Sequence, residues 1–143
     1  MEWEGIKKPG LEAVKEIFKR QYEEELKSLS QLVGLLGLPV SAEELIKYSG
    51  LTISYYSVKG HEYMKLIGTL TGERAGKEEE WLMRKKGEEA ERERRYRRKS
   101  VHLLNARKTE EKEIELGWLI HYWRRAKAIK KWLEEVEEKL SQE

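Results

Sequence analysis

Residues 109–140, TEEKEIELGWLIHYWRRAKAIKKWLEEVEEKL, carry the pattern that decides the fold. Apolar residues recur there at intervals of three and four, which lays one stripe along a long α-helix. Thr109 can cap this helix by accepting hydrogen bonds from free backbone N–H groups, and the glutamates after it suit the positive end of the helix dipole. The predicted stripe consists of Ile114, Trp118, Tyr122, Ala126, Ile129, Leu133, Val136 and Leu140.

The middle of this helix is apolar on nearly all sides between Leu116 and Trp123. A helix that is apolar on most sides must be covered on most sides. We therefore expect the segment to be the central element of a helical protein and to contact several partners.

The composition points to a charged, intracellular protein. The chain has 143 residues, 39% of them charged, with a net charge of +2 and no cysteine. Disulfides, thiolate zinc sites and cysteine nucleophiles are thereby excluded. All 27 acidic residues are Glu, so Asp-based dyads and triads are excluded too. A chain rich in Glu, Lys and Arg is typical of hyperthermophiles, and we expect an archaeal source. The sequence shows no signal peptide or membrane span, which predicts a cytoplasmic protein.

The sequence predicts a single domain over residues 1–143, mainly α, built as a helical bundle or helical hairpin with one small β-hairpin. Gly37 and Pro39 end the first helix, and the pair Ser41 and Glu44 forms a capping box that opens a short helix. The predicted elements are a helix over 10–37, a short helix over 41–49, a β-hairpin over 51–70, a short helix over 77–86, a charged helix over 88–107 and a long C-terminal helix over 109–141.

The hairpin segment LTISYYSVKGHEYMKLIGTL is rich in β-branched and aromatic residues around a central Lys59-Gly60 turn. Pairing outward from that turn places Tyr56 opposite Tyr63 and Ser54 opposite Lys65, on a face that also carries His61. The other face, with Leu51, Ile53, Tyr55, Met64 and Leu66, is the predicted core side. Two interpretations of the first face remain open: its tyrosines pack under a helix, or its rings and cations stack on bases and meet phosphates.

The basic segment RERRYRRK, residues 92–99, is the strongest functional signal. In an antiparallel hairpin of the last two helices it would lie beside a second basic run that starts at Arg124, and the two would merge into one phosphate-binding patch. The alternative is a solvated, salt-bridged helix face. The candidate nucleic-acid-binding residues are Arg92, Arg94, Arg95, Arg97, Arg98, Lys99, Arg124, Arg125, Lys65, Tyr56 and Tyr63.

Catalysis has little support in the sequence. His61, His102 and His121 fall on different predicted elements without metal-ligand spacing. The segment GERAGK, residues 72–77, lacks the spacing and the following Ser or Thr of a phosphate-binding loop. We therefore predict no catalytic residue, no metal and no cofactor, and a protein that is not an enzyme.

The hairpin has one resemblance to known proteins, carried by Tyr55, Tyr56, Lys59, Gly60 and Tyr63 in the pattern YY-x-x-KG-x-x-Y. It resembles a ribbon in uncharacterised small archaeal proteins, some from viruses and plasmids, where the ribbon follows one helix and precedes a charged one. The resemblance covers the hairpin segment, and those relatives usually continue with an aromatic-Leu-Gly segment where this chain has Trp81-Leu82-Met83. It implies no established activity, but it favours a mobile-element origin.

Together these patterns predict a non-catalytic nucleic-acid-binding protein whose favoured target is DNA, bound largely without regard to sequence. The alternative is a protein–protein adaptor that binds another protein through its helix faces. The apolar stretches 32–38 and 116–123 exceed what one small bundle covers, so we also expect a homodimer. No membrane partner is expected.

Overall fold

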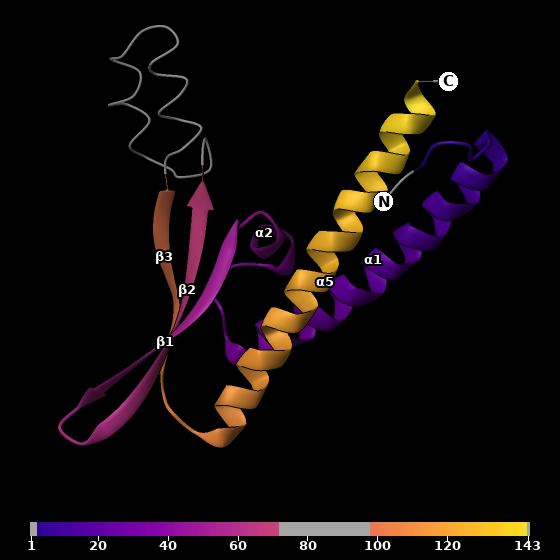
Figure 1. Ribbon diagram of the computed structural model, residues 1–143. Coiled ribbons are helices and arrows are strands. Elements are labelled where there is room, and N and C mark those ends of the chain that lie inside the picture. The colour runs from indigo at the N-terminus through magenta and orange to yellow at the C-terminus, as the bar shows by residue number, and fades with distance from the viewer. Residues whose placement is uncertain (1–2, 72–97, 143) are drawn as a thin grey trace, which may run out of the picture. The chain divides into compact units, whose positions relative to one another are not determined.

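A computed structural model of the protein describes residues 3–71 and 98–142 (Figure 1). These residues form two compact units. A helical unit combines the chain up to Gly37 with the chain from Gly117 onward, and a sheet unit spans Leu38–Leu116. The protein is therefore a helix-dominant α+β protein with one small antiparallel sheet. Among the described residues, no helix is both long enough and apolar enough to cross a membrane.

The helical unit is an antiparallel pair of α1 (Lys8–Leu36) and the C-terminal part of α5 (Glu110–Ser141). Pro9 in the first turn favours the start of α1, and Gly37 ends the helix in a left-handed conformation with φ 64°. The antiparallel order follows from contacts that α5 makes with α1 and with the segment just before α1. Trp3 Nε1 donates to Glu135 Oε2 at 3.2 Å, and Arg125 Nε donates to Glu25 Oε1 at 2.8 Å.

Apolar side chains from the two helices form the core of this unit. Phe18 lies between Trp3 and Trp132, with ring centroids 5.8 Å away on each side. Packing of apolar helix faces against each other supplies most of the stability of helices in proteins. The buried cluster consists of Leu11, Phe18, Ile129 and Val136, and Trp3, Ile6, Val14, Tyr22, Trp132, Leu133 and Leu140 pack against it.

The predicted stripe of α5 is correct in its second half and wrong in its first. Ile114 and Trp118 are 54% and 50% exposed, whereas Leu116, Leu119 and Trp123 are buried. Each step of four residues overshoots a full turn by about 40° at 100° per residue. Three such steps separate Ile114 from the buried Ala126, so Ile114 lies about 120° around the helix from the buried face. The buried residues Leu116, Leu119, Trp123, Ala126 and Ile129 instead follow steps of three, four, three and three residues.

The sheet unit contains a short helix and three antiparallel strands in the order β1-β2-β3. The elements are α2 (Ala42–Ile46), β1 (Gly50–Val58), β2 (His61–Thr71) and β3 (Arg98–Arg107). Lys59 (φ 50°) and Gly60 (φ 80°) both have positive φ, as a two-residue turn of type I′ requires. The predicted register is confirmed, with Tyr56 opposite Tyr63 and Ser54 opposite Lys65.

The third strand corrects the predicted charged helix. Residues 98–107 do not continue a helix over 88–107, because they form β3 and pair with β2. The predicted hairpin between that helix and α5 is therefore wrong for these residues, and α5 pairs with α1 in the helical unit. The predicted helix over 77–86 and the first part of the charged helix, residues 88–97, lie outside the described residues.

One face of the sheet is its core side, as predicted. Leu51, Met64 and Leu66 are buried there, although Tyr55 on the same face is 55% exposed. The short helix α2 precedes β1. Its N-terminus is capped by Ser41, whose Oγ accepts a hydrogen bond from the backbone N–H of Glu44 at 3.2 Å. The buried Tyr48 follows α2 and packs against the core side of β2, where Gly68 leaves room for its ring.

Candidate nucleic-acid interface

The opposite face of the sheet, here called the polar face, carries cations and aromatic rings but no acidic residue among the described residues. Glu makes up 27 of the 143 residues, so this absence marks a segregation of charge. Strand alternation and the observed register define the face. Its members are Gly50, Thr52, Ser54, Tyr56 and Val58 of β1, His61, Tyr63, Lys65, Ile67, Thr69 and Thr71 of β2, and Arg98, Ser100, His102, Asn105 and Arg107 of β3.

A β-bulge in β3 keeps both ends of that strand in phase with the polar face. Leu66 pairs with Leu104 and the next residue, Ile67, pairs with His102, which leaves Leu103 as the extra residue. Leu103 is 4% exposed and lies near Gly68 on the core side. In a regular strand, His102 and Asn105 would point to opposite faces, because they are three residues apart and side chains alternate with a period of two. The bulge places both on the polar face.

The centre of the polar face is a stacked pair of tyrosines. The rings of Tyr56 and Tyr63 lie 5.2 Å apart between centroids and 17° from parallel. Lys65 Nζ lies 4.8 Å from the centroid of the Tyr56 ring, close enough for a cation–π interaction. The Tyr56 hydroxyl donates to Asn105 Oδ1 at 2.5 Å. Neighbours on β2 and β3 thus fix the orientation of Tyr56.

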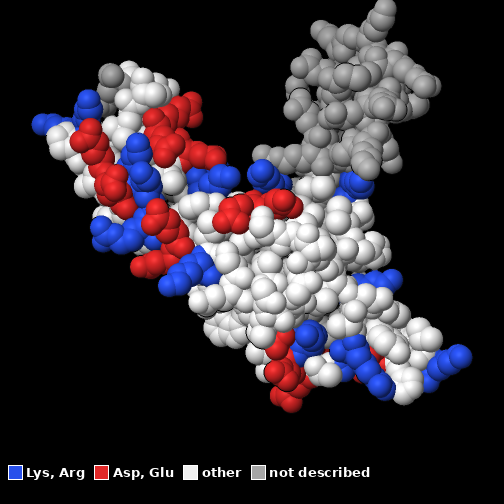
Figure 2. Space-filling model, turned by 180° about the vertical axis from the view of Figure 1, so that it is seen from behind, with Lys and Arg blue, Asp and Glu red and all other residues white. Residues whose placement is uncertain are grey.

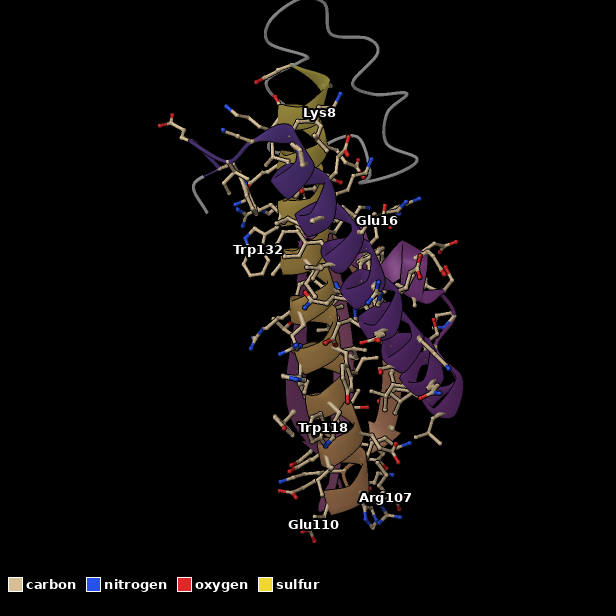
Figure 3. The ribbon with its side chains drawn as sticks, turned by 90° about the vertical axis from the view of Figure 1, so that its right-hand side faces the viewer. Lys8, Glu16, Arg107, Glu110, Trp118 and Trp132 are labelled. Carbon is tan, nitrogen blue, oxygen red and sulfur yellow. The ribbon has the colours of Figure 1, made fainter. Side chains whose placement is uncertain are left out.

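Two further polar groups meet beside this pair, near the hairpin turn. The guanidinium of Arg107 donates from Nη2 to Nδ1 of His61. Arg107 lies at the end of β3, shortly before Glu110 at the start of α5 (Figure 3). Its remaining guanidinium donors and the ammonium of Lys65 can bind anions on the polar face.

The polar face is accessible to solvent. Tyr56, Tyr63 and Lys65 are half-buried by one another and by their strand neighbours, and Asn105 and Arg107 are exposed. Within this unit the ring of Tyr48, just after α2, lies against Gly68 on the other face. Within the sheet unit, the contacts of the two tyrosine rings are with each other and with Lys65 and Asn105 on neighbouring strands.

The predicted arginine patch is only partly described. Arg92, Arg94, Arg95 and Arg97 lie outside the described residues. Arg98 lies on the polar face, but Lys99 pairs with Leu70 and therefore points to the opposite face.

Arg124 and Arg125 are exposed on α5 and belong to the helical unit. Arg125 forms an ion pair with Glu25, which reduces its capacity for another anion. Figure 2 shows basic and acidic side chains interspersed along the helical unit. This pattern matches the salt-bridged helix face considered above.

Sequence reasoning placed Tyr56, Tyr63 and Lys65 on one face but missed Asn105 and Arg107 as members of the site. Both missed residues lie on β3, which had been assigned to a helix. A local signal existed in the segment SVHLLNAR, where Ser100 and His102 alternate with Val101 and Leu103 as in a half-buried strand.

A separate ion cluster joins the end of β3 to the start of α5. Lys108 Nζ lies 3.5 Å from both Glu62 Oε2 and Glu113 Oε1, and 5.5 Å from the centroid of the Tyr55 ring. The carboxylate of Glu62 and then that of Glu113 raise the pKa of Lys108 above its ordinary value. Lys108, the cation of this cluster, is therefore already paired, and we do not assign the cluster to the interface.

The helical unit has a shallow groove of about 370 Å³. Leu35 and Trp118 on its walls are 65% and 50% exposed, and the Trp118 ring stacks on Tyr122 at 5.8 Å. Ser28, Gln31 and Leu32 complete the lining. Contiguous exposed apolar patches can mark surfaces that contact other proteins, whereas single exposed apolar side chains are common on any protein.

Chemically, the polar face can stack planar rings and neutralise anions. Within residues 3–71 and 98–142, no group of three or more His or Glu side chains is placed to hold a metal ion. Comparison with models of protein families, with curated proteins and with solved structures gives no match.

Proposed function

We propose that the protein is a non-catalytic nucleic-acid-binding protein whose polar face holds unpaired nucleotides. The observation that carries this proposal is the stacked Tyr56–Tyr63 pair flanked by Lys65 and Arg107 on an accessible face with no described acidic residue. Aromatic rings on a sheet can stack on exposed bases, and cations beside them neutralise the phosphates that connect those bases.

The same chemistry favours single strands over a duplex. Bases in a duplex are stacked on each other, whereas the bases of a single strand can separate and lie on a ring of the protein. Stacking and charge neutralisation tolerate any base, so binding is largely independent of sequence. DNA stays the favoured target, and the Glu-, Lys- and Arg-rich composition supports a hyperthermophilic archaeon or its mobile element as the source.

The test is fluorescence anisotropy of labelled single-stranded DNA and RNA, and of duplex DNA, at several salt concentrations. The double variant Lys65→Gln/Arg107→Gln removes two cations from the polar face. On a single strand, the log–log salt slope changes by about 0.7 for each lost phosphate contact, or about 1.4 for both. The matched control Lys19→Gln/Arg20→Gln removes one Lys and one Arg from exposed positions of α1, and we expect its slope to stay close to that of the wild type.

Equal loss of affinity in both double variants would mean that net charge, and not the polar face, drives binding. A loss confined to Arg124→Gln/Arg125→Gln would move the interface to α5. Absence of binding by the wild type even at low salt would overturn the proposal.

The second candidate function is a protein–protein adaptor. The groove beside Leu35 and Trp118 favours it, because these exposed apolar side chains lie together on the helical unit. The groove would take an apolar side chain or a short helix of another protein. This function becomes the leading one if the wild type fails to bind every nucleic acid tested.

A further inference from the structure

The edge strand β1 contains no charged residue. Its sequence, GLTISYYSV over Gly50–Val58, is uncharged in a chain of which 39% is charged. Natural proteins usually protect a long edge strand from pairing with another chain by means of charges, proline or a bulge. β1 is nine residues long and has no proline or charge, and its register with β2 is continuous.

The other edge of the sheet, β3, has the protection that β1 lacks. It begins with Arg98 and Lys99, ends with Arg107, and contains the bulge at Leu103. Two copies of β3 would bring these cations together, and the bulge would interrupt the ladder. The two edges therefore differ in their capacity to pair with a second chain.

The backbone of β1 offers a regular set of hydrogen-bonding groups at its outer edge. A two-residue turn makes Val58 and His61 a hydrogen-bonded pair, and such pairs recur at every second residue. The N–H and C=O groups of the residues between them point away from β2. These outward residues are Leu51, Ile53, Tyr55 and Ser57, and within the described part of the chain no backbone hydrogen bond from them leads anywhere else.

We propose that β1 pairs antiparallel with β1 of a second copy of this chain, which joins two three-stranded sheets into one of six strands. A two-fold axis through Ser54 gives full overlap of the nine residues. The outward groups of Ile53 then meet those of Tyr55 in the partner, so the hydrogen-bonding groups are in register.

This register is self-complementary in its side chains as well. Ile53 faces Tyr55 of the partner twice, and aromatic–β-branched pairs across antiparallel strands contribute to sheet stability. Thr52 faces Tyr56, and Ser54 faces its own copy. Tyr55 is 55% exposed and Val58 is 47% exposed in one chain, which leaves apolar surface for this contact. No pair in the register brings like charges together, which makes a second copy a suitable partner.

The pairing also determines where the two polar faces lie. Residues of even number pair with residues of even number, so the two polar faces lie on the same side of the joined sheet. The dimer would present both tyrosine pairs on one surface. The inference itself does not depend on nucleic-acid binding, because it rests on the chemistry of the β1 edge.

A single engineered cysteine tests the geometry directly, because the chain has no cysteine of its own. In the proposed register Ser54 and its copy form a non-hydrogen-bonded pair, with Cα atoms about 4.5 Å apart. That separation lies within the range of a disulfide. Under mild oxidation, we expect Ser54→Cys to double the 17.0 kDa mass on a non-reducing gel. The matched control Ser100→Cys lies on the same face of β3 and should remain at the monomer mass.

A second pair of variants tests the dimer without a covalent link. Ser54→Glu places two carboxylates opposite each other across the two-fold axis, while within one chain the new carboxylate lies opposite Lys65 and is compatible with the fold. In sedimentation without nucleic acid, we expect Ser54→Glu to be monomeric, and the wild type and the control Ser100→Glu to be dimeric. A monomeric wild type, or a Ser54→Glu variant as dimeric as the wild type with no Ser54→Cys cross-link, would overturn the proposal. Neither result depends on whether the polar face binds nucleic acid.

Discussion

Gly68 shows how closely the residues of the sheet unit are packed. A Cβ atom at this position would lie 2.3 Å from Cδ2 and from Cε2 of Tyr48, and 3.1 Å from Cδ1 of Leu103. Tyr48 and Leu103 are both buried, so neither can swing into solvent to make room. The absence of a side chain at Gly68 is what allows the segment after α2 to lie against β2.

We predict that Gly68→Ala destabilises the protein by about 1–3 kcal/mol, the range for overpacking a buried site. Chemical denaturation followed by circular dichroism measures the change. Gly50→Ala is the matched control, because a Cβ there would meet Thr69 at an ordinary 3.7 Å and should have little effect. A Gly68→Ala variant as stable as the Gly50→Ala control would contradict this account of the packing.

Tyr48 also links stability to pH. Burial, and then the carboxylate of Glu44, raise the pKa of Tyr48 above its ordinary 10.0. The unfolded chain therefore loses this proton at a lower pH than the folded chain. The contribution of Tyr48 to the unfolding free energy is therefore fully present below pH 10.0, and it is lost as the pH rises through the higher pKa of the folded state.

We predict that the Tyr48→Phe variant loses less unfolding free energy at alkaline pH than the wild type does. The unfolding free energies of the wild type and of the variant should differ by a constant amount near neutral pH, and the difference should shift in favour of the variant above about pH 10. Denaturation at a series of pH values measures both free energies. If the unfolding free energies of the wild type and the variant change in parallel throughout the alkaline range, the titration of Tyr48 does not contribute to the pH dependence of stability.

At the scale of elements, the sequence predicted the hairpin well because its signals are local. The Lys59-Gly60 turn and the alternation of residues on each strand together determine the register. The same alternation also predicted which face of the hairpin is buried. Tyr55, close to the turn, is the exception, because its side chain lies on that face but is exposed.

The third strand could not be predicted in the same way. Residues 98–107 follow a run of Glu and Arg that is typical of a helix, and their strand conformation depends on pairing with β2, a contact between distant parts of the chain. For that reason Tyr56, Tyr63 and Lys65 of the site were predicted, whereas Asn105 and Arg107 were not.

Gly117 lies within α5 at the boundary between the two units. A glycine inside a helix destabilises it relative to alanine by about 0.5–1 kcal/mol, because the unfolded chain gains backbone freedom. A Cβ at Gly117 would meet no atom within 4 Å. We predict that Gly117→Ala raises the unfolding free energy by about this amount and slows amide exchange in the surrounding turns.

Gly37→Ala is the contrasting control for this prediction. Gly37 has a φ of 64°, a conformation that strains any residue with a Cβ, so this variant should be less stable than the wild type. If Gly117→Ala and Gly37→Ala both stabilised the protein, the loss of backbone freedom in the unfolded chain would not be enough to explain the effect at Gly117.

At the scale of the whole molecule, charge is segregated although the total is nearly balanced at +2. The helical unit carries both signs close together (Figure 2), whereas the described residues of the polar face include no acid. The Arg125–Glu25 ion pair is only partly exposed, with the Arg125 side chain 56% and the Glu25 side chain 15% exposed, whereas fully exposed ion pairs contribute little to stability at moderate temperature. A face of one sign attracts an oppositely charged polymer from a distance, so the distribution of charge matters more for partner choice than the net value.

The two compact units share one element, because α5 begins in the sheet unit and continues through the helical unit without interruption. Unfolding of either unit would fray a helix that the other unit also uses. The single domain expected from the chain length stays a prediction, and the continuity of α5 is the feature that favours it.

The positive φ of Lys59 has an evolutionary consequence. An L-residue with a Cβ in this conformation is disfavoured by about 1–2 kcal/mol, and asparagine or glycine would relieve the strain at the turn. Random drift under selection for stability alone would therefore replace this lysine. In a lineage that uses the hairpin tip to meet phosphates, selection would instead retain a basic residue despite the strain. The residues that homologues carry at this position distinguish a turn kept for its shape from one kept for its charge.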